Sequence, residues 1–286
     1  MQDPMTAPGR PAILATLPAT KAFLPPDSIS RRVGAESALL LGGGRALLLQ
    51  LAHPAVARGV RDHSQFQSDP FGRLVGTLEA VYGVVFGDEQ LAIGIGRGIQ
   101  RRHDRVTGPT YAANDPANLL WVHATLVDTA LRLYRLFVGT LTTEEEEAYY
   151  HEQQRVAAVF GCPIDEQPAT LADFRVWFDE QIAGFDLEDV NRAMIGDVLH
   201  PDLPWMLAPV LVLIRFLTYA ILPDPLRRQL RIPWGGTQRR LGSALVFGLR
   251  AGYRMTPRPL RILPSTLFTR RAIGKARERA AANAAA

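Results

Sequence analysis

The sequence contains six histidines, and their spacing limits the chemistry that they can support. They are His53, His63, His103, His123, His151 and His200. No two of them stand four residues apart, so the sequence holds no helical zinc-hydrolase motif. The single Cys162 rules out a cysteine-based zinc cluster and a disulfide framework within the chain. Cys162 has no nearby base and no Gly-x-Ser-x-Gly elbow is present, which argues against nucleophilic hydrolysis.

His103 lies in the charged run "GRGIQRRHDRVTG", yet helical spacing turns it inward. His103 continues the apolar stripe of Ile95 and Ile99, since residues four apart share a helix face. The arginines of the run fall on other faces: Arg101, Arg102 and Arg105. A buried imidazole needs a partner. It either hydrogen-bonds a backbone carbonyl or binds a metal ion through one ring nitrogen.

His123, in "NLLWVHATLVDT", is the second histidine that the pattern turns inward. Leu119, Leu126 and Val127 flank it on the same face of the predicted helix. The same two alternatives apply: a core histidine with one hydrogen bond, or a functional imidazole. On another face of this helix, Asp128 and Arg132 stand four residues apart, and we expect them to form an ion pair.

Arg73, Gly76 and Thr77 form a third candidate group, on a predicted helix that starts near Pro70. Arg73 and Thr77 share one face, and Gly76 borders it without a side chain. Either Arg73 pairs at the surface, or the group lines a small open space with two hydrogen-bond donors. The chain from Thr77 to His103 is long enough for two antiparallel helices that face each other across a planar cofactor.

The elements that must position these side chains are predicted to be helices. Apolar residues recur with helical period over most of the chain, and no alternation typical of strands persists. The run Gly42-Gly43-Gly44 predicts a close approach or a kink. Thr142 or Thr143 with Glu145 or Glu146 predicts a capping box, and Gly161 closes that helix. Further helices are predicted from Glu89 to Val106, from Asp115-Pro116, from Thr170, and over 205–222 and 237–254. The fold class is therefore all-α.

The stretch "WMLAPVLVLIRFLTYAIL" (205–222) approaches the length of a membrane span. Pro209 and Arg215 interrupt it, so we expect a buried helix instead. The N-terminal residues lack the charged region and long apolar run of a secretory signal. On these grounds we expect a cytoplasmic protein.

Charge is distributed unevenly along the chain. Residues 226–286 carry 14 Lys and Arg against the single acidic residue Glu278. Such a basic segment suits an anionic lipid surface, nucleic acid or an acidic partner, or is simply a solvated end. No aromatic residue follows Phe268, which argues against nucleic-acid binding there. We therefore expect no nucleic-acid partner, and keep peripheral membrane contact as an alternative.

Four stretches of the chain together carry a family pattern. They are "LLLQLAHPAVARGVRDHSQFQSDPFGRLVGTL", "RRHDRVTG", "YAANDPANLLWVHATLVDTALRLYRLF" and "LTTEEEEAYYHEQQRVAAVFGCP". In this order they resemble the latex-clearing proteins (rubber oxygenases) and MpaB-type oxygenases, over roughly residues 32–240. The resemblance implies a multi-helix single domain with a globin-like core that holds haem b. It also implies dioxygen chemistry, including the oxidative cleavage of double bonds in isoprenoid chains.

The resemblance also implies roles for individual residues. His103 aligns with the proximal ligand of the haem iron, and Arg73 and Thr77 align with the distal arginine and threonine. Gly76 stands where latex-clearing proteins have a lysine that can cap the iron, so the distal side is expected to be open. His123 is expected to line the pocket or to hydrogen-bond a propionate.

The remaining expectations concern the surroundings of the cofactor. Arg101, Arg102 or Arg105 could reach the propionates, although solvated arginines fit the sequence equally well. Apolar helices around Trp121, Leu126 and Phe137 are expected to form a dry pocket for a lipophilic substrate.

Together these observations predict a loosely ordered segment 1–28, a helical haem-binding domain over 29–255 and a basic tail 256–286. The expected activity is a haem b-dependent oxygenase acting with dioxygen or peroxide on a hydrophobic, isoprenoid- or lipid-like small molecule. Three alternatives stay open: a haem-binding sensor or carrier without turnover, a peroxidase-like haem enzyme, and a haem-free helical protein whose inward histidines are structural.

Overall fold

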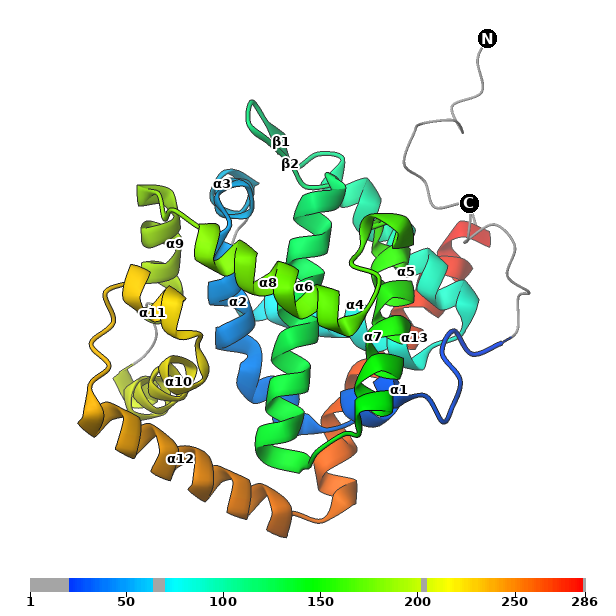
Figure 1. Cartoon of the computed structure of the whole chain (residues 1–286). Coiled ribbons are helices and arrows are strands. Elements are labelled where there is room, and N and C mark those ends of the chain that lie inside the picture. The colour runs from blue at the N-terminus through cyan, green and yellow to red at the C-terminus, as the bar shows by residue number, and fades with distance from the viewer. Residues whose placement is uncertain (1–20, 64–69, 202–204, 285–286) are drawn as a thin grey trace.

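A computed structural model describes residues 21–63, 70–201 and 205–284 of the chain. The protein is 79% helical, with two short strands in the described part, so the predicted all-α single domain is confirmed. The helices are α1 (Ile29–Gly34), α2 (Gly43–Ala52), α3 (Pro54–His63), α4 (Pro70–Phe86), α5 (Glu89–His103), α6 (Pro116–Leu133), α7 (Thr143–Phe160), α8 (Leu171–Gly184), α9 (Asp189–Leu199), α10 (Ala208–Ile221), α11 (Asp224–Gln229), α12 (Gly236–Met255) and α13 (Arg258–Ala284). Figure 1 shows their arrangement.

Short elements complete the chain. Single turns of 3-10 or π-helix are η2 (Ser37–Gly42), η3 (Tyr134–Val138), η4 (Ile164–Glu166) and η5 (Trp205–Leu207). Strand β1 (Thr107–Gly108) pairs antiparallel with β2 (Tyr111–Ala112) between α5 and α6. Of the segment 1–28, predicted to be loosely ordered, residues 1–20 lie outside the described part of the chain. Phe23 and Leu24, by contrast, are buried against Val84 and Val85 of α4.

The helix ends follow the capping residues that the sequence predicts. Thr142 caps α7 and forms the capping box with Glu145, so Thr142 rather than Thr143 is the cap. Gly161 ends α7 with φ 107°, a left-handed conformation that glycine adopts without strain. Asp115 caps α6 by accepting a hydrogen bond from the Ala117 amide at 2.9 Å.

Helix α6 lies at the centre of the bundle, with α2 and α7 on either side of it (Figure 1). The buried Arg45 of α2 fixes α6 in place. Its guanidinium lies 2.6 Å from the Asp128 carboxylate and donates to the Thr129 hydroxyl at 2.6 Å and to the Ile221 carbonyl at 2.9 Å. The predicted pair of Asp128 with Arg132 is therefore wrong. Asp128 pairs with Arg45, whose guanidinium is the more deeply buried of the two, while Arg132 is only partly buried.

The glycine run 42–44 marks a close approach, as predicted. A Cβ atom at Gly42 would collide with the Thr129 methyl group of α6, and one at Gly44 with the Thr218 hydroxyl of α10. These positions therefore let α2 pack directly against two neighbouring helices. The run is also where the 3-10 turn η2 changes into α2.

The basic segment 256–286 contains α13, which packs along α4. Phe268 stacks on Tyr82 with ring centroids 5.6 Å apart, Ala272 is buried, and the Lys275 ammonium lies 2.5 Å from the Glu79 carboxylate. Helix α13 therefore covers one side of α4, and these contacts attach the C-terminal segment to the rest of the fold.

The prediction that 205–222 forms a buried helix is wrong for most of its length. Trp205, Met206, Val210 and Ile214 are 83%, 68%, 54% and 51% exposed. Only the C-terminal turns of α10 pack into the core, through Leu217, Thr218 and Ile221. Hydrophobic composition alone does not bury a helix when no neighbouring element covers it.

No single helix in the described part of the chain is long and apolar enough to cross a membrane. The segments Ser37–Ala52 and Pro54–His63 reach the required length and composition only together, and they are bent by 102° relative to each other.

Candidate active site

Helices α4 and α5 form an antiparallel pair. Gly87 and Asp88 connect them, and the Asp88 carboxylate caps α5 by accepting from the Leu91 amide at 2.8 Å. At Gly83, a Cβ atom would collide with Ile95 of α5 and approach the Ala272 methyl group of α13 to 3.0 Å. The two helices therefore cross closely at Gly83 and Ile95.

This crossing sets the register of the candidate residues. Helices rise equally per residue, so positions equally far from the crossing lie at the same level along an antiparallel pair. Gly76 precedes Gly83 by as many residues as Arg102 follows Ile95. Gly76 and Arg102 therefore lie at the same height along the helix pair. Thr77 and His103 lie within one residue of this level. On this register the predicted proximal and distal residues occupy corresponding positions along α4 and α5.

Open space surrounds this end of α4. Gly76 and Thr77 are exposed, and apart from the adjoining backbone of α4 no atom of the described residues lies within 4 Å of the position that a Cβ of Gly76 would occupy. Arg73 lies one turn earlier on the same helix, and its side chain is outside the described part of the structure. Thr77 therefore places a hydroxyl beside a position without a side chain on an exposed stretch of α4.

His103 is the last residue of α5 and is half-buried, whereas Arg101 and Arg102 beside it are exposed. This difference confirms that His103 turns inward relative to its charged neighbours. Its carbonyl accepts a hydrogen bond from the Val106 amide at 2.8 Å, which starts the turn into β1. Three basic residues in the last helical turn also suit the negative end of the helix dipole.

The segment after His103 is tied to the rest of the fold. The Asn114 side-chain amide donates to the Gln100 carbonyl at 3.0 Å and to the Asp104 carboxylate at 2.7 Å. The His63 imidazole lies 3.0 Å from the Thr107 carbonyl, joining the end of α3 to β1. These bonds restrict the position of the α5 terminus, which is what a ligand at its last residue requires.

His123 is the other predicted site residue, and it is buried in α6. Burial lowers the pKa of His123 to about 4, while a hydrogen bond to the backbone of Gln153 on α7 opposes that shift. The imidazole is therefore neutral at physiological pH. Its Nε2 atom is buried without a hydrogen-bond partner. One ring nitrogen of His123 thus remains available for a ligand.

Trp121 lies on the opposite side of α6 from His123, because two residues along a helix turn the chain by more than half a circle. Its indole nitrogen donates to the Leu49 carbonyl at 3.1 Å. Its ring packs against Phe185 at 4.8 Å and Phe178 at 5.3 Å. Trp121 therefore belongs to an aromatic cluster between α2 and α8, away from the His123 side of the helix.

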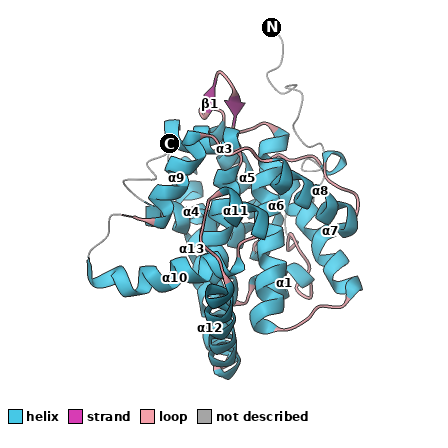
Figure 2. Cartoon of the chain, turned by 60° about the vertical axis from the view of Figure 1, so that its left-hand side comes forward, coloured by secondary structure: helices cyan, strands magenta, loops and turns pink. Residues whose placement is uncertain are grey.

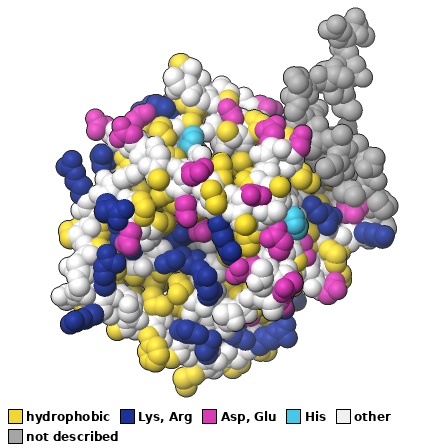
Figure 3. Space-filling view, in the orientation of Figure 1, with side chains coloured by type: hydrophobic (Ala, Val, Ile, Leu, Met, Phe, Trp, Pro, Cys, Tyr) yellow, Lys and Arg dark blue, Asp and Glu magenta, His cyan; other side chains and the backbone are white. Residues whose placement is uncertain are grey.

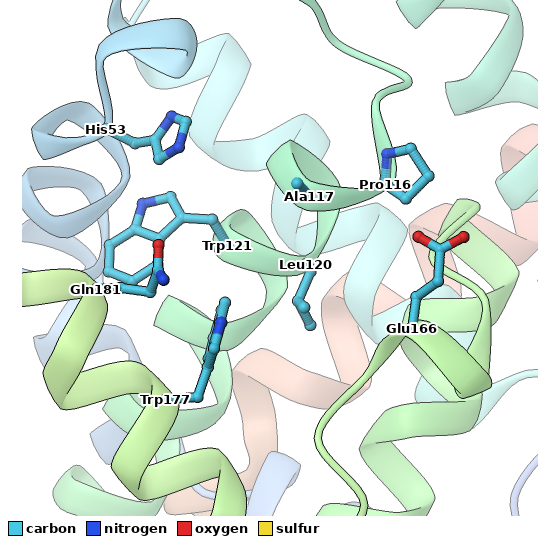
Figure 4. A pocket seen from close by; sticks show the side chains of 8 residues that line it. All are labelled: His53, Pro116, Ala117, Leu120, Trp121, Glu166, Trp177 and Gln181. Atoms are coloured by element: carbon cyan, nitrogen blue, oxygen red, sulfur yellow. The ribbon is translucent and has the colours of Figure 1, made fainter.

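A surface hollow of about 290 Å³ opens at this cluster. Figure 4 shows its lining, with His53 above the Trp121 ring and Glu166 on the opposite side. The eight lining residues are His53, Pro116, Ala117, Leu120, Trp121, Glu166, Trp177 and Gln181. The sequence interpretation gave His53 no role, although its position before Pro54 marks the break between α2 and α3. Burial lowers the pKa of His53, and its Nδ1 atom has no hydrogen-bond partner.

Two other types of chemistry find little support in the structure. In the described residues, no three His, Cys, Asp or Glu side chains lie close enough together to hold a metal ion. Cys162 is buried, and burial raises the pKa of its thiol to about 12, so it stays protonated and unreactive.

Comparison with known families decides the classification. Residues 30–260 match the catalytic-domain family described as "ER-bound oxygenase mpaB/B'/Rubber oxygenase". The chain belongs to this family. A search of curated proteins and a search of solved structures each found no match.

The chain is therefore an oxygenase-family catalytic domain. This confirms the family that the sequence resemblance indicated. The matched range contains all the predicted site residues, from Arg73 on α4 to His123 on α6. It also contains α10 and α12, so the exposed apolar helix α10 is part of the oxygenase domain. The match ends at position 260, near the start of α13.

Proposed function

We propose that this protein is a haem b-dependent oxygenase in which His103 would hold the haem iron. The observation that supports this most is the register of α4 and α5. By this register the half-buried His103 and the exposed Gly76 and Thr77 occupy corresponding positions on the two helices, which supports a ligand between them. The proposed substrate is a hydrophobic, isoprenoid- or lipid-like small molecule, with dioxygen or peroxide as the oxidant.

The donor set at this end suits haem in particular. Haem would need only one protein ligand to hold its iron, and the imidazole of His103 would provide it. The exposed guanidinium groups of Arg101 and Arg102, in the same helical turn as His103, suit the propionates. Bound haem would supply the redox chemistry that activates the oxidant.

The residues of the chain would position and stabilise the reactants. Thr77 would donate a hydrogen bond from its hydroxyl on the distal side, and Arg73 would offer a positive charge there. Fixed donors of this kind stabilise negative charge that develops on oxygen during the reaction. Gly76 would leave room for the oxidant or the substrate where relatives carry a lysine.

His123 would act as a neutral polar group in an otherwise apolar interior. With a pKa near 4 it carries no charge at physiological pH, so it can accept a hydrogen bond through Nε2 without bringing a buried charge. We propose that Nε2 accepts a hydrogen bond from a donor group of the substrate; a hydrogen bond to a propionate is the alternative, and it requires the tautomer in which Nε2 carries the proton. Trp121 remains a proposed contact of bound molecules through the hollow beside its ring.

Oxygen uptake with candidate alkenes and phenols tests the proposed activity. The purified protein should first show a Soret band, and uptake should then depend on an added alkene. A Soret band without substrate-dependent uptake would favour a haem sensor or carrier. Oxidation of phenols by peroxide without consumption of dioxygen would favour a peroxidase. Absence of haem after reconstitution would leave a helical protein with structural histidines.

A lysine introduced at Gly76 tests the open distal side. Gly76→Lys should shift the visible spectrum towards that of a nitrogen-capped haem and reduce substrate-dependent oxygen uptake. The matched control is Gly94→Lys, because Gly94 is also exposed and also has no heavy atom within 4 Å of its Cβ position. Equal spectra for the two variants would contradict the placement of Gly76 beside the iron.

A further inference from the structure

Exposed apolar side chains gather in the C-terminal third of the chain. Large hydrophobic side chains that are exposed include Trp205, Met206, Leu207, Val210, Val212, Leu213, Ile214, Leu241, Phe247, Met255, Leu260, Leu263 and Leu267. Before position 205, only Leu40 and Val176 belong to this class among the described residues. Soluble monomers rarely expose large contiguous apolar patches, so a cluster of this kind indicates an interaction surface.

On α12 the exposed apolar residues form a stripe. Leu241, Ala244, Phe247, Ala251 and Met255 are exposed and recur with helical spacing. Phe247 is 73% exposed and Met255 is 83% exposed. The opposite side of α12 packs inward, since Gly242 is buried against Ala220 and Trp234. The stripe therefore faces away from the protein.

Arginines accompany this stripe. Arg240 falls within it, and Arg254 and Arg250 lie along one flank, as helical spacing requires. Arg228, Arg231 and Arg258 are also exposed in the segments next to α12. A helix with an apolar face and a basic flank is typical of proteins that lie in the interface of a membrane.

Acidic residues are nearly absent from the same segment. Between Trp205 and Arg271 the only acidic residue is Asp224. Its carboxylate forms an ion pair with Arg227 and lies 3.7 Å from the Arg239 guanidinium. No carboxylate is therefore left in this segment to neutralise the exposed arginines of α12.

The figures show how these helices sit on the molecule. In Figure 2, α12 extends below the other helices and α10 runs out to one side. Figure 3 shows Lys and Arg side chains next to hydrophobic ones along the lower part of the molecule, where Figure 1 places α12. Both helices therefore lie at the outside of the molecule.

We propose that α10, α12 and the first turns of α13 form a docking face for a bilayer that contains anionic phospholipid. The apolar side chains would enter the boundary between headgroups and acyl chains, and the arginines would bind lipid phosphates and carboxylates. Charge complementarity favours this occupant over a second copy of the chain, because self-association through this face would bring arginines against arginines. The proposal is independent of haem binding.

Vesicle co-flotation of the full-length protein tests the proposal. Binding should be strong to vesicles of phosphatidylcholine with phosphatidylserine, weak to phosphatidylcholine alone, and reduced by salt. The variant Arg240→Glu/Arg254→Glu should weaken binding by about tenfold or more, since each basic residue near an anionic surface contributes roughly a fivefold gain. Phe247→Ser should weaken it as well.

Val176→Ser is the matched control. Val176 is a 61% exposed apolar residue on α8, outside the proposed face, so its replacement should leave vesicle binding unchanged. Tryptophan emission gives a second readout. Trp205 is 83% exposed, and its emission should shift to the blue on binding and be quenched by brominated lipid; the shift should be lost in Trp205→Phe.

Three results would overturn the proposal. The first is absence of binding to anionic vesicles by a folded protein. The second is binding that is independent of salt and of the two arginines. The third is a concentration-dependent dimer in sedimentation that Phe247→Ser abolishes, without vesicle binding, because the face would then be an interface between copies.

Discussion

Helices α6 and α10 are both rich in apolar residues, but α6 is buried whereas much of α10 is exposed. Helix α6 is surrounded, and even its polar groups find partners inside the protein: Thr129 binds Arg45, and the indole of Trp121 binds the Leu49 carbonyl. Helix α10 leaves most of its N-terminal side chains exposed and buries only its last turns.

The difference shows that polar contacts mark a core helix as clearly as its apolar content does. Residues of α6 such as Thr125, Thr129 and His123 would be costly inside the protein without partners, and each has one on a neighbouring helix or in its own chain segment. The exposed part of α10 offers no comparable polar side chain. Its surface is suited to an apolar environment outside the protein.

Removal of the buried guanidinium should have the largest effect on the free energy of unfolding. Arg45→Ala should destabilise the protein by about 3–5 kcal/mol, because Asp128 loses its charged partner and a cavity remains. The control is Arg215→Ala on α10, where a single 3.5 Å contact to the Leu199 carbonyl is lost. Urea denaturation measures both; equal losses would show that Arg45 does not anchor α6.

The same leucine substitution on each helix sharpens the comparison. Leu133→Ala on α6 removes a fully buried side chain that packs against Gly42, and should cost about 2–5 kcal/mol. Leu213→Ala on α10 removes a 47% exposed side chain and should change stability by no more than about 0.5 kcal/mol. A large loss for Leu213→Ala would mean that α10 is covered in solution.

Acid should destabilise the core around α6 through His123. Its pKa falls from 6.5 to about 4 on folding, so the unfolded chain takes up the proton first as the pH drops. The stabilisation is therefore present above about pH 6.5 and is lost as the pH falls towards 4, by about 2 kcal/mol between about pH 7 and pH 5.

The variant His123→Gln isolates this contribution. It should lose less stability than the wild type over the same pH range. Denaturation curves at several pH values measure the slopes. Parallel pH profiles for wild type and His123→Gln would contradict the burial of a neutral imidazole.

The smallest effect is expected at the start of α6. Asp115→Ala removes the hydrogen bond to the Ala117 amide and should cost about 1 kcal/mol. Asp115→Asn retains a capping side chain and should lower the free energy of unfolding by only a few tenths of a kcal/mol. Helix α10 has no side-chain cap at its N-cap residue Leu207. If Asp115→Ala were silent, the defined start of α6 would not depend on its cap.

Local signals in the sequence predicted the helices well. Asp115, Thr142, Thr170 and Gly161 act through hydrogen bonds to nearby backbone or through their own backbone conformation, so short spacing is enough to recognise them. The inward direction of His103 and His123 likewise followed from helical period. These features need no knowledge of which helices meet.

Features that depend on distant partners could not be predicted in this way. Asp128 has Arg132 one turn away, but its partner Arg45 comes from another helix. The exposure of α10 depends on which elements cover it, and the packing of α13 on α4 depends on contacts such as that of Lys275 with Glu79. The hollow beside His53 is assembled from four separate segments of the chain.

The absorption spectrum of the purified protein, reconstituted with haem b, tests the central claim most directly. Wild type and the control His151→Ala should bind haem with the same Soret band in the oxidised and dithionite-reduced states. His103→Ala should remain folded by circular dichroism and lose haem or show a changed spectrum. Full haem content with an unchanged spectrum in His103→Ala would contradict the assignment of His103 as the axial ligand.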